Sequence, residues 1–292
     1  MDTQRTGMDA ELFALQDGVF VRRSGVTHRE EEYDEQAFRV LQDMQHKHFW
    51  YRGRHRFLFA ALQRQLARLG RAPGKMAVLD LGTGCGGWVR YLAAQQLPGF
   101  RELALADSSR RALAVAASVA GPAHACYQVD LRDLGWRQRW DVIFLLDVLE
   151  HIGDQRAVLE QIRDSLAPGG LLLVTAPALN FFWSCNDELA LHQRRYAKKD
   201  FAELAGALQL QLLDARYFMF FLSPLLLAAR AGRRGAVELS AEARAQHIAA
   251  THRVPPRPLN ALLAATFAAE TPLGLRWNFP WGTSLLGVFQ KP

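Results

Sequence analysis

Four aspartates between residues 80 and 147 stand at the ends of short apolar segments, namely Asp80, Asp107, Asp130 and Asp147. The first of them is followed by a glycine-rich run, Gly82-Thr-Gly-Cys-Gly-Gly87. Glycine has no side chain, so a ligand can approach the backbone of such a run closely. Carboxylates accept hydrogen bonds from amino and hydroxyl groups. Together these features predict a site for a small polar cofactor.

The glycine run fits two cofactor patterns. Gly82, Gly84 and Gly87 satisfy the dinucleotide pattern G-x-G-x-x-G, with Asp107 in the place of a ribose-binding acid. The pattern D-x-G-x-G-x-G is satisfied by Asp80, Gly82, Gly84 and Gly86. Asp80 lies inside the strand end, where a dinucleotide site usually has an apolar residue, and its carboxylate suits a cofactor with a cationic amino-acid end. The second pattern is therefore favoured, and a nicotinamide-dependent oxidoreductase remains the alternative.

Alternating strands and helices must position these residues. Strands are expected at 76–81, 101–107, 123–130, 140–147 and 171–177. Helices are expected at 88–96, 109–120 and 155–166, the last ending at the break Ala167-Pro-Gly-Gly170. This order predicts an α/β fold with a doubly wound parallel sheet. In such a sheet the ligand site lies at the carboxyl ends of the strands.

Composition limits the class of protein. The chain has 292 residues, of which 50% are hydrophobic and 22% charged, and this excludes a disordered or fibrous protein. Cys85, Cys126 and Cys185 are too widely spaced for a disulfide framework or a structural zinc site, so we expect a reducing compartment and no metal. The start of the chain has no apolar signal segment, and the most apolar window, 217–229, is too short to span a bilayer. A cytoplasmic location is expected.

Charge is distributed unevenly near the start of the chain. Residues 1–35 carry nine acids and four bases, whereas residues 36–75 carry nine Lys or Arg and one acid. Bases and aromatic residues interleave in the segment His46–Arg56, which could bind a phosphate or an anionic head group. The favoured interpretation is a solvated helix in which Phe49, Trp50 and Phe57 pack inward. The net charge of +6 permits an acidic partner without requiring one.

An ordered set of segments resembles the class I S-adenosylmethionine (SAM) dependent methyltransferases. The segments are VLDLGTGCGGW, ALADSS, QVDLRDL, WDVIFLLDVLEHI and LAPGGLLLVTAP, between about residues 78 and 178. The later element His192-Gln-Arg-Arg-Tyr196 resembles a subgroup that includes quinone C-methylase-like proteins and methyltransferases of glycan, lipid and natural-product pathways. The resemblance implies a seven-stranded Rossmann-like sheet with a reversed terminal hairpin formed by residues 209–217 and 283–289.

The resemblance also implies SAM as the cofactor and assigns its contacts. Asp80 would hold the methionine amino group, and Asp107 would accept both ribose hydroxyls. The glycine loop, with Gly82, Gly84 and Gly86, would lie against the cofactor. Asp130 and Leu131 would contact the adenine.

Asp147, His151 and His192 are the candidate catalytic residues. Methyl transfer is an in-line displacement in which an enzyme mainly aligns the nucleophile. A base is needed only when the acceptor must lose a proton, and His151 and His192 are the candidates for this role. Asp147 would lie beside the methyl group. Arg195 and Tyr196 would bind a carboxylate or phosphate of the acceptor.

Residues 218–282 form an insertion that is too long for a hairpin connection. It is apolar and basic, which is typical of a helical cap over an acceptor pocket or of a dimer interface. Phe220 and Phe221 are its candidate substrate contacts, and the same surface could rest on a membrane. The chain thus divides into an N-terminal tail and helical lead-in (1–74), a SAM-binding core (75–217), the insertion (218–282) and a terminal strand (283–292).

These features predict a SAM-dependent methyltransferase. Its acceptor would be an apolar or amphipathic small molecule that is aromatic, quinone-like, a natural product or lipid-linked. A non-catalytic partner protein with the same fold is a second alternative. A nucleic-acid substrate is not expected, because Asp147-Val-Leu-Glu150 stands where a base-clamping Asn/Asp-Pro-Pro-Tyr/Phe motif would be.

Overall fold

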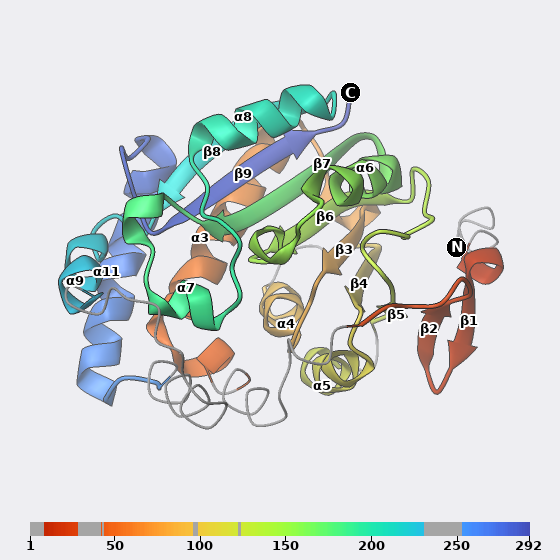
Figure 1. Cartoon of the computed structure of the whole chain (residues 1–292), viewed down its shortest axis with the longest axis horizontal. Helices are drawn as coiled ribbons and strands as arrows, with labels where there is room; N and C mark the ends of the chain where they lie inside the picture. The colour runs from red at the N-terminus through yellow and green to blue at the C-terminus, as the bar shows by residue number, and fades with distance from the viewer. Residues whose placement is uncertain (1–8, 29–41, 43, 96–98, 122–123, 231–252) are drawn as a thin grey trace.

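The computed structural model in Figure 1 contains a nine-stranded sheet with helices on both faces. The structure describes residues 9–28, 42, 44–95, 99–121, 124–230 and 253–292. The strands are β1 (Phe13–Gln16), β2 (Val19–Arg22), β3 (Ala77–Leu81), β4 (Glu102–Asp107), β5 (Cys126–Gln128), β6 (Trp140–Leu146), β7 (Leu166–Pro177), β8 (Gln211–Phe218) and β9 (Ser284–Gln290). The helices are α3 (Phe49–Arg68), α4 (Gly87–Ala93), α5 (Arg110–Ala120), α6 (Gln155–Ser165), α7 (Cys185–Leu189), α8 (Lys198–Ala207), α9 (Ser223–Arg230) and α11 (Arg257–Arg276), with short 3-10 turns η2 (Pro73–Lys75), η3 (Leu149–His151) and η4 (Asn180–Phe182).

The strand order β1-β2-β5-β4-β3-β6-β7-β9-β8 contains the expected seven-stranded core. Strands β5, β4, β3, β6 and β7 are parallel, β9 is antiparallel to β7, and β8 is antiparallel to β9. The α/β fold and the reversed terminal hairpin are therefore confirmed. Because β8 runs in the same direction as β7, its carboxyl end lies at the same sheet edge as the ends of β3, β4 and β6.

Two boundaries differ from the sequence-based expectation. Helix α6 ends at Ser165, before the Ala167–Gly170 break as expected, but strand β7 already begins at Leu166. Leu166 pairs with Trp140 of β6, and Leu171 pairs with Val142. The four residues of the break lie between these pairs and form a bulge in β7. The third core strand is shorter than expected and covers only Cys126–Gln128.

A β-hairpin precedes the helical lead-in, and this corrects the expectation of a tail at the start of the chain. Asp17 and Gly18 connect β1 to β2 with φ values of 48° and 77°. An Asp-Gly pair between alternating apolar residues is a strong hairpin signal, so the sequence contained it. Strand β2 then pairs in parallel with β5. The region 1–74 therefore extends the core sheet by two strands.

Buried Asp9 anchors this hairpin to the sheet. Its carboxylate accepts hydrogen bonds from the Tyr127 hydroxyl at 3.1 Å and the Trp136 indole N–H at 3.0 Å. The guanidinium of buried Arg139 donates to the same carboxylate at 3.1 Å. The acidic start of the chain thus supplies one internal ion pair.

The two faces of the sheet pack against different helices. Figure 1 shows α6 and α8 in front of the sheet and α3 behind it. In β3, Ala77, Leu79 and Leu81 belong to the core on the side of α6 and α8, whereas Val78 packs with side chains of α3, α4 and α5. Side chains of a strand alternate between faces, so Asp80 points to the same side as Val78. The Asp80 carboxyl is therefore on the face of the sheet that packs against α3.

The described part of the insertion belongs to the core of the domain. Helix α11 lies beside α3, and its Phe267 ring lies against Gly53, where a Cβ atom would be only 1.9 Å from that ring. Asn260 accepts a hydrogen bond from the Phe49 N–H at 2.9 Å and donates to the Lys47 carbonyl at 2.7 Å. Residues 231–252 of the expected cap lie outside the described residues. None of the described helices is long and apolar enough to cross a membrane.

Candidate functional site

The glycine loop between β3 and α4 requires glycine at three positions. Gly82, Gly84 and Gly86 have φ values of 75°, 52° and 74°, in the left-handed region that side chains disfavour. A Cβ atom on Gly82 would lie 2.5 Å from the Val148 side chain, and one on Gly86 would lie 2.8 Å from the Ala116 backbone. The loop therefore approaches both neighbouring segments closely.

Asp107, at the end of β4, holds the backbone of this loop. Its two carboxylate oxygens accept hydrogen bonds from the Gly84 N–H at 3.0 Å and from the Ser109 N–H at 2.9 Å. The residue is buried, and desolvation raises the pKa of the carboxyl. The N-cap of α5 is Ser109, which accepts from Ala112 N–H. Asp107 thus orients the loop from the neighbouring strand.

Asp80 is a buried carboxyl group beside the loop. The Thr83 hydroxyl donates to one of its oxygens at 2.8 Å. Burial is the main cause that raises the pKa of Asp80 to about 7, and the Arg54 guanidinium opposes this increase. Such a carboxyl group gains from the arrival of a cationic ligand, because the ligand stabilises its charged form.

Arg54 is a site residue that was not predicted. It comes from α3, is 7% exposed, and pairs with the carboxylate of Asp147 just after β6. Its guanidinium carbon lies 5.1 Å from the ring centre of Trp50 and 5.5 Å from that of Tyr51. The signal was its place on the helix, because Arg54 shares the apolar face with Phe57. A buried arginine on such a face requires an acidic partner.

The basic and aromatic segment 46–56 is therefore only partly a solvated helix. Phe49 and Phe57 pack inward as expected, whereas Trp50 is half-buried. His55 is also buried, and burial lowers its pKa well below the ordinary value. Burial raises the pKa of Tyr51 to about 12. The segment contributes a positive charge to the site interior through Arg54.

Asp130 and Leu131 follow β5 at the same sheet edge. The Asp130 carboxylate accepts a hydrogen bond from the Arg132 N–H at 2.9 Å. Leu131 is partly buried against the core. Their expected contact with an adenine stays a prediction.

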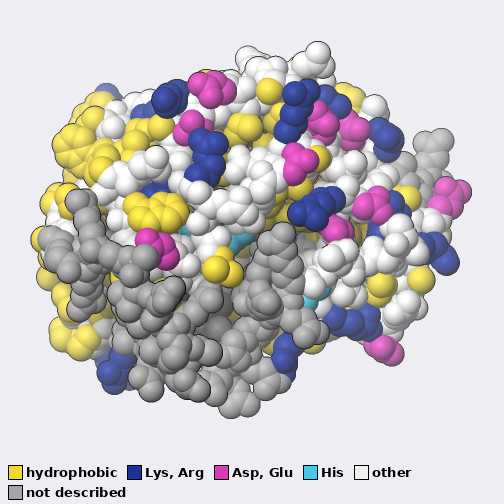
Figure 2. Space-filling model, in the orientation of Figure 1, with side chains coloured by type: hydrophobic (Ala, Val, Ile, Leu, Met, Phe, Trp, Pro, Cys, Tyr) yellow, Lys and Arg dark blue, Asp and Glu magenta, His cyan; other side chains and the backbone are white. Residues whose placement is uncertain are grey.

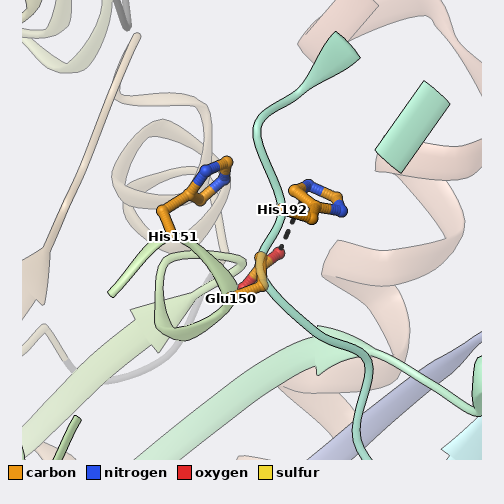
Figure 3. A group of neighbouring side chains, drawn as sticks. All are labelled: Glu150, His151 and His192. Carbon is orange, nitrogen blue, oxygen red and sulfur yellow. Dashed lines mark ion pairs between the residues drawn. The ribbon is translucent and has the colours of Figure 1, made fainter. Parts of the chain in front are cut away.

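Glu150, His151 and His192 form a cluster beyond the end of β6. One ligand atom of each residue lies within 4.8 Å of those of the other two. Figure 3 shows the His192 ring and the Glu150 carboxylate facing each other, with Nε2 and Oε1 4.0 Å apart. The rings of His151 and His192 have their centres 4.9 Å apart. His151 lies in η3 and His192 in the turn after α7. The fold thus brings together two candidate bases that are 41 residues apart in the sequence (192−151).

The surroundings of the cluster shift the pKa values of His151 and Glu150. Burial and the neighbouring His192 lower the pKa of His151 to about 4. Burial and the charge of Asp147 raise the pKa of Glu150 well above its ordinary value. His151 is therefore neutral near pH 7 and is a weak proton acceptor. Asp147 and Glu150 interact electrostatically, which places the cluster beside the Arg54–Asp147 pair.

Arg195 and Tyr196 lie in a buried network below this cluster. The Arg195 guanidinium donates to both carboxylate oxygens of Asp187, at 2.8 and 3.0 Å, and to the Ala178 carbonyl at 3.0 Å. The Tyr196 hydroxyl donates to the Leu149 carbonyl at 3.1 Å. These contacts position the turn that carries His192. Both side chains are below 8% exposed, and their expected contact with an acceptor stays a prediction.

Phe220 and Phe221 follow the carboxyl end of β8. Phe220 stacks on Phe279 with ring centres 4.5 Å apart, and Phe221 is 40% exposed. Figure 2 shows hydrophobic side chains gathered along the left margin, where Figure 1 places α9 and α11. The exposed apolar residues of this region, called here the apolar face, are Phe221, Leu225, Leu227, Leu259, Leu262, Trp277 and Trp281.

Comparison with known proteins explains the arrangement around the glycine loop. A family model described as a methyltransferase domain matches residues 51–235. The chain belongs to this methyltransferase family. The match begins within α3, so it includes Arg54 as well as the loop. No curated protein matches the sequence.

Solved structures show the same fold at low sequence identity. One is a chain of the complex between the Haloferax volcanii Trm112 methyltransferase activator and a putative methyltransferase, with a TM-score of 0.55, 18% identity, and coverage of 90% of this chain and 96% of that one. Haemonchus contortus phosphoethanolamine N-methyltransferase 2, solved with SAM, gives a TM-score of 0.56 and 16% identity over 90% of this chain and 58% of its own. The structure of the plantazolicin methyltransferase BamL has a TM-score of 0.53 and 15% sequence identity, and the match covers 88% of this chain and 90% of that one.

The methyltransferase uses SAM, and its residues fit this cofactor. Membership of this family excludes the nicotinamide alternative. The cofactor supplies an electrophilic methyl group on a sulfonium. A buried carboxyl at Asp80 suits its ammonium, and the carboxylate of Asp107 suits its ribose. Our assignment of these individual contacts stays a prediction.

The affinity for SAM should depend on pH through Asp80. In the free protein this carboxyl has a raised pKa of about 7, so it is largely protonated below that pH. Binding an ammonium favours the carboxylate, so affinity should rise by up to about tenfold per pH unit toward pH 7 and level off above it. Calorimetric titrations from about pH 5.5 to 8 measure this slope.

Asp80→Asn is the matched control for that titration, because the amide is neutral at every pH. Its affinity should remain at the low level of the acidic wild-type protein, without a slope. An identical pH slope in the Asp80→Asn protein would assign the effect to another group.

Proposed function

We propose that this methyltransferase transfers the methyl group of SAM to an apolar or amphipathic small-molecule acceptor. The observation that carries the proposal is the separation of two features at one sheet edge. The polar cluster of Glu150, His151 and His192 follows β6 and contacts the turn after α7. The aromatic residues Phe220 and Phe221 follow β8.

The distance between these features describes the acceptor. From β6, the strands β7, β9 and β8 follow in order, so β8 is three strand spacings away. At about 4.8 Å per spacing, the cluster and Phe220 lie roughly 14 Å apart along the edge. An acceptor that contacts both has a polar, reacting end at the cluster and an apolar body that reaches the aromatic residues. An aromatic compound with a side chain, a quinone-like molecule or a lipid-linked molecule meets this description.

The roles of the polar residues follow from their positions. Arg54 and Asp147 form a fixed pair between the glycine loop and the cluster, and this pair would orient the acceptor. Glu150, His151 and His192 would contact the reacting group of the acceptor. Arg195 and Tyr196, which we had expected to bind the acceptor, support His192 from below. The acceptors in two compared structures, a triazolic plantazolicin analogue and phosphomonomethylethanolamine, are also small molecules.

Replacing Phe221 with aspartate tests the apolar end. A charge at this exposed ring should lower kcat/KM for the acceptor by about tenfold, because about 1.5 kcal/mol of apolar contact is lost. The affinity for SAM should change less than about twofold, since the glycine loop is four strands distant. Phe220→Asp should act in the same direction and also lower the melting temperature, because it removes the stacking on Phe279. Methyl transfer from labelled SAM to panels of phenols, quinones and lipid-linked sugars provides the measurement.

Leu15→Asp serves as the control for this test. Leu15 is an equally apolar residue, 65% exposed, in the hairpin at the other end of the sheet. Its replacement should leave turnover unchanged. Wild-type turnover of the true acceptor by Phe221→Asp would remove the apolar face from the acceptor site.

A further inference from the structure

We propose that Glu150, His151 and His192 bind a divalent first-row metal ion, with Zn²⁺ the best fit, and that this ion binds a hydroxyl oxygen of the acceptor. The acceptor half of this inference rests on the proposed function. The donor set consists of two imidazoles and one carboxylate. Three such protein ligands with an open position are typical of catalytic zinc sites. The sequence alone indicated no such site, because His192 is far from the other two residues in the chain.

The distances allow coordination after small side-chain rotations. The three ligand atoms lie within 4.8 Å of one another. In a tetrahedral site with bonds of about 2.0–2.2 Å, ligand atoms are separated by roughly 3.3–3.5 Å. Closing the cluster onto an ion therefore requires shifts of about 1 Å at the ends of side chains. The backbone need not move.

An unpartnered carboxylate oxygen points to a missing ligand. Glu150 is 1% exposed, and its Oε2 atom is buried without a hydrogen-bond partner among the described residues. A buried carboxylate oxygen without a donor is costly, because water no longer solvates it. A metal ion in the cluster would bind this carboxylate and remove that cost.

The surroundings of His192 are those of a metal ligand. Its Nδ1 lies 3.0 Å from a carboxylate oxygen of Asp187, which only accepts hydrogen bonds. In the neutral ring this contact puts the proton on Nδ1, so Nε2, 4.0 Å from Oε1 of Glu150, is the nitrogen that can bind a metal. Metal-binding histidines commonly donate their second N–H to a carboxylate in this way. Arg195 holds both oxygens of Asp187, so the orientation of the imidazole is determined by a buried ion pair.

Backbone hydrogen bonds preorganise the cluster. The N–H of Gln193 donates to the Glu150 carbonyl at 2.8 Å, and the Gln193 side-chain amide donates to the His151 carbonyl at 3.2 Å. The two segments that carry the ligands are thus joined directly. The side chain of His192 is 18% exposed, so the cluster reaches the surface at this residue.

A metal ion would determine the class of acceptor. A hydroxyl bound to a cation loses its proton to water more readily, because the charge of the ion stabilises the oxygen anion. This oxygen then forms the new O–C bond while the methyl carbon leaves the sulfonium sulfur, which keeps the electron pair of the broken bond. The products are a methyl ether and a neutral thioether. The inference therefore favours a phenol or enol acceptor.

Metal titration of the full-length chain tests the site. Protein freed of metal by chelator dialysis should bind about one equivalent of ZnCl₂ in calorimetry. With CoCl₂ it should develop the d–d absorption of a four- or five-coordinate ion. Glu150→Gln, His151→Asn and His192→Asn should each weaken zinc binding by at least about tenfold. His124→Asn, which replaces a half-buried histidine at β5, should bind zinc like the wild type.

The outcomes separate the metal site from the proposed function. If the wild-type protein bound neither zinc nor cobalt stoichiometrically, the proposed metal site would be refuted by this measurement alone. Unchanged zinc binding in all three ligand variants, with melting temperatures near that of the wild type, would overturn the assignment of ligands. Methylation of a phenolic acceptor at full rate with a chelator present would support the proposed function and refute the metal. Zinc binding without methylation of any hydroxyl acceptor would refute the acceptor class alone.

Discussion

Replacing Gly84 with valine should reduce the affinity for SAM by about 100-fold or more. Gly84 has a φ of 52°, and a residue with a Cβ atom loses about 1–2 kcal/mol in this conformation. Valine would also place two methyl groups in the space between the loop and the cofactor. A shift of the loop to relieve the strain would break the 3.0 Å bond from the Gly84 N–H to Asp107. The blocked space and the lost bond together should weaken binding by about 3 kcal/mol, which corresponds to a roughly 100-fold change in affinity.

Gly70→Val separates backbone strain from loss of the cofactor site. Gly70, after α3, has a φ of 61° with open space where a Cβ atom would lie. Both variants should lose stability in thermal unfolding, but only Gly84→Val should lose SAM binding in calorimetry. Normal SAM affinity and turnover in Gly84→Val would show that the loop is not the cofactor cradle.

Replacing Asp107 with alanine should weaken SAM binding by at least about 100-fold. Two charge-assisted hydrogen bonds to the ribose would be lost, each worth about 1.5–3 kcal/mol. The structure adds a second effect. The N–H groups of Gly84 and Ser109 would lose their shared acceptor, so the loop would be less well ordered and the melting temperature should fall. Calorimetry well below the melting transition measures the affinity of the folded variant.

Asp200→Ala controls for the loss of a carboxylate that accepts a backbone hydrogen bond. Asp200 accepts from the Ala197 N–H at 2.7 Å at the start of α8, far from the glycine loop. It should lower stability without changing the affinity for SAM. If Asp107→Ala retained wild-type affinity, Asp107 would be a structural residue of the loop and not a ribose ligand.

Local sequence patterns were sufficient for the SAM-binding half of the fold. The alternation along β3 and the glycines after it encode a strand, a left-handed loop and a helix within 18 consecutive residues (76–93). Asp107 could be placed beside this loop because parallel strands end at one edge. Such features depend on the conformational preferences of a few neighbouring residues, which are present in the sequence itself.

The N-terminal region shows where local interpretation was incomplete. The Asp17–Gly18 turn was readable as a hairpin, but its pairing with β5 depends on Asp9 contacting Tyr127 and Trp136. Arg54 stood on an apolar helical face, which signals a buried charge. Its partner Asp147 is 93 residues later (147−54), and no pattern in either segment names the other.

By itself the sequence determined the fold class and the family, because these follow from periodicity and glycine placement, whereas the residues around SAM stay a prediction. The tertiary structure alone decided which polar groups meet beyond β6. It joined His192 to Glu150 and His151, and it paired Arg195 with Asp187. The physical reason is that a buried charge is stable only beside a compensating group, and packing of distant segments determines which group that is.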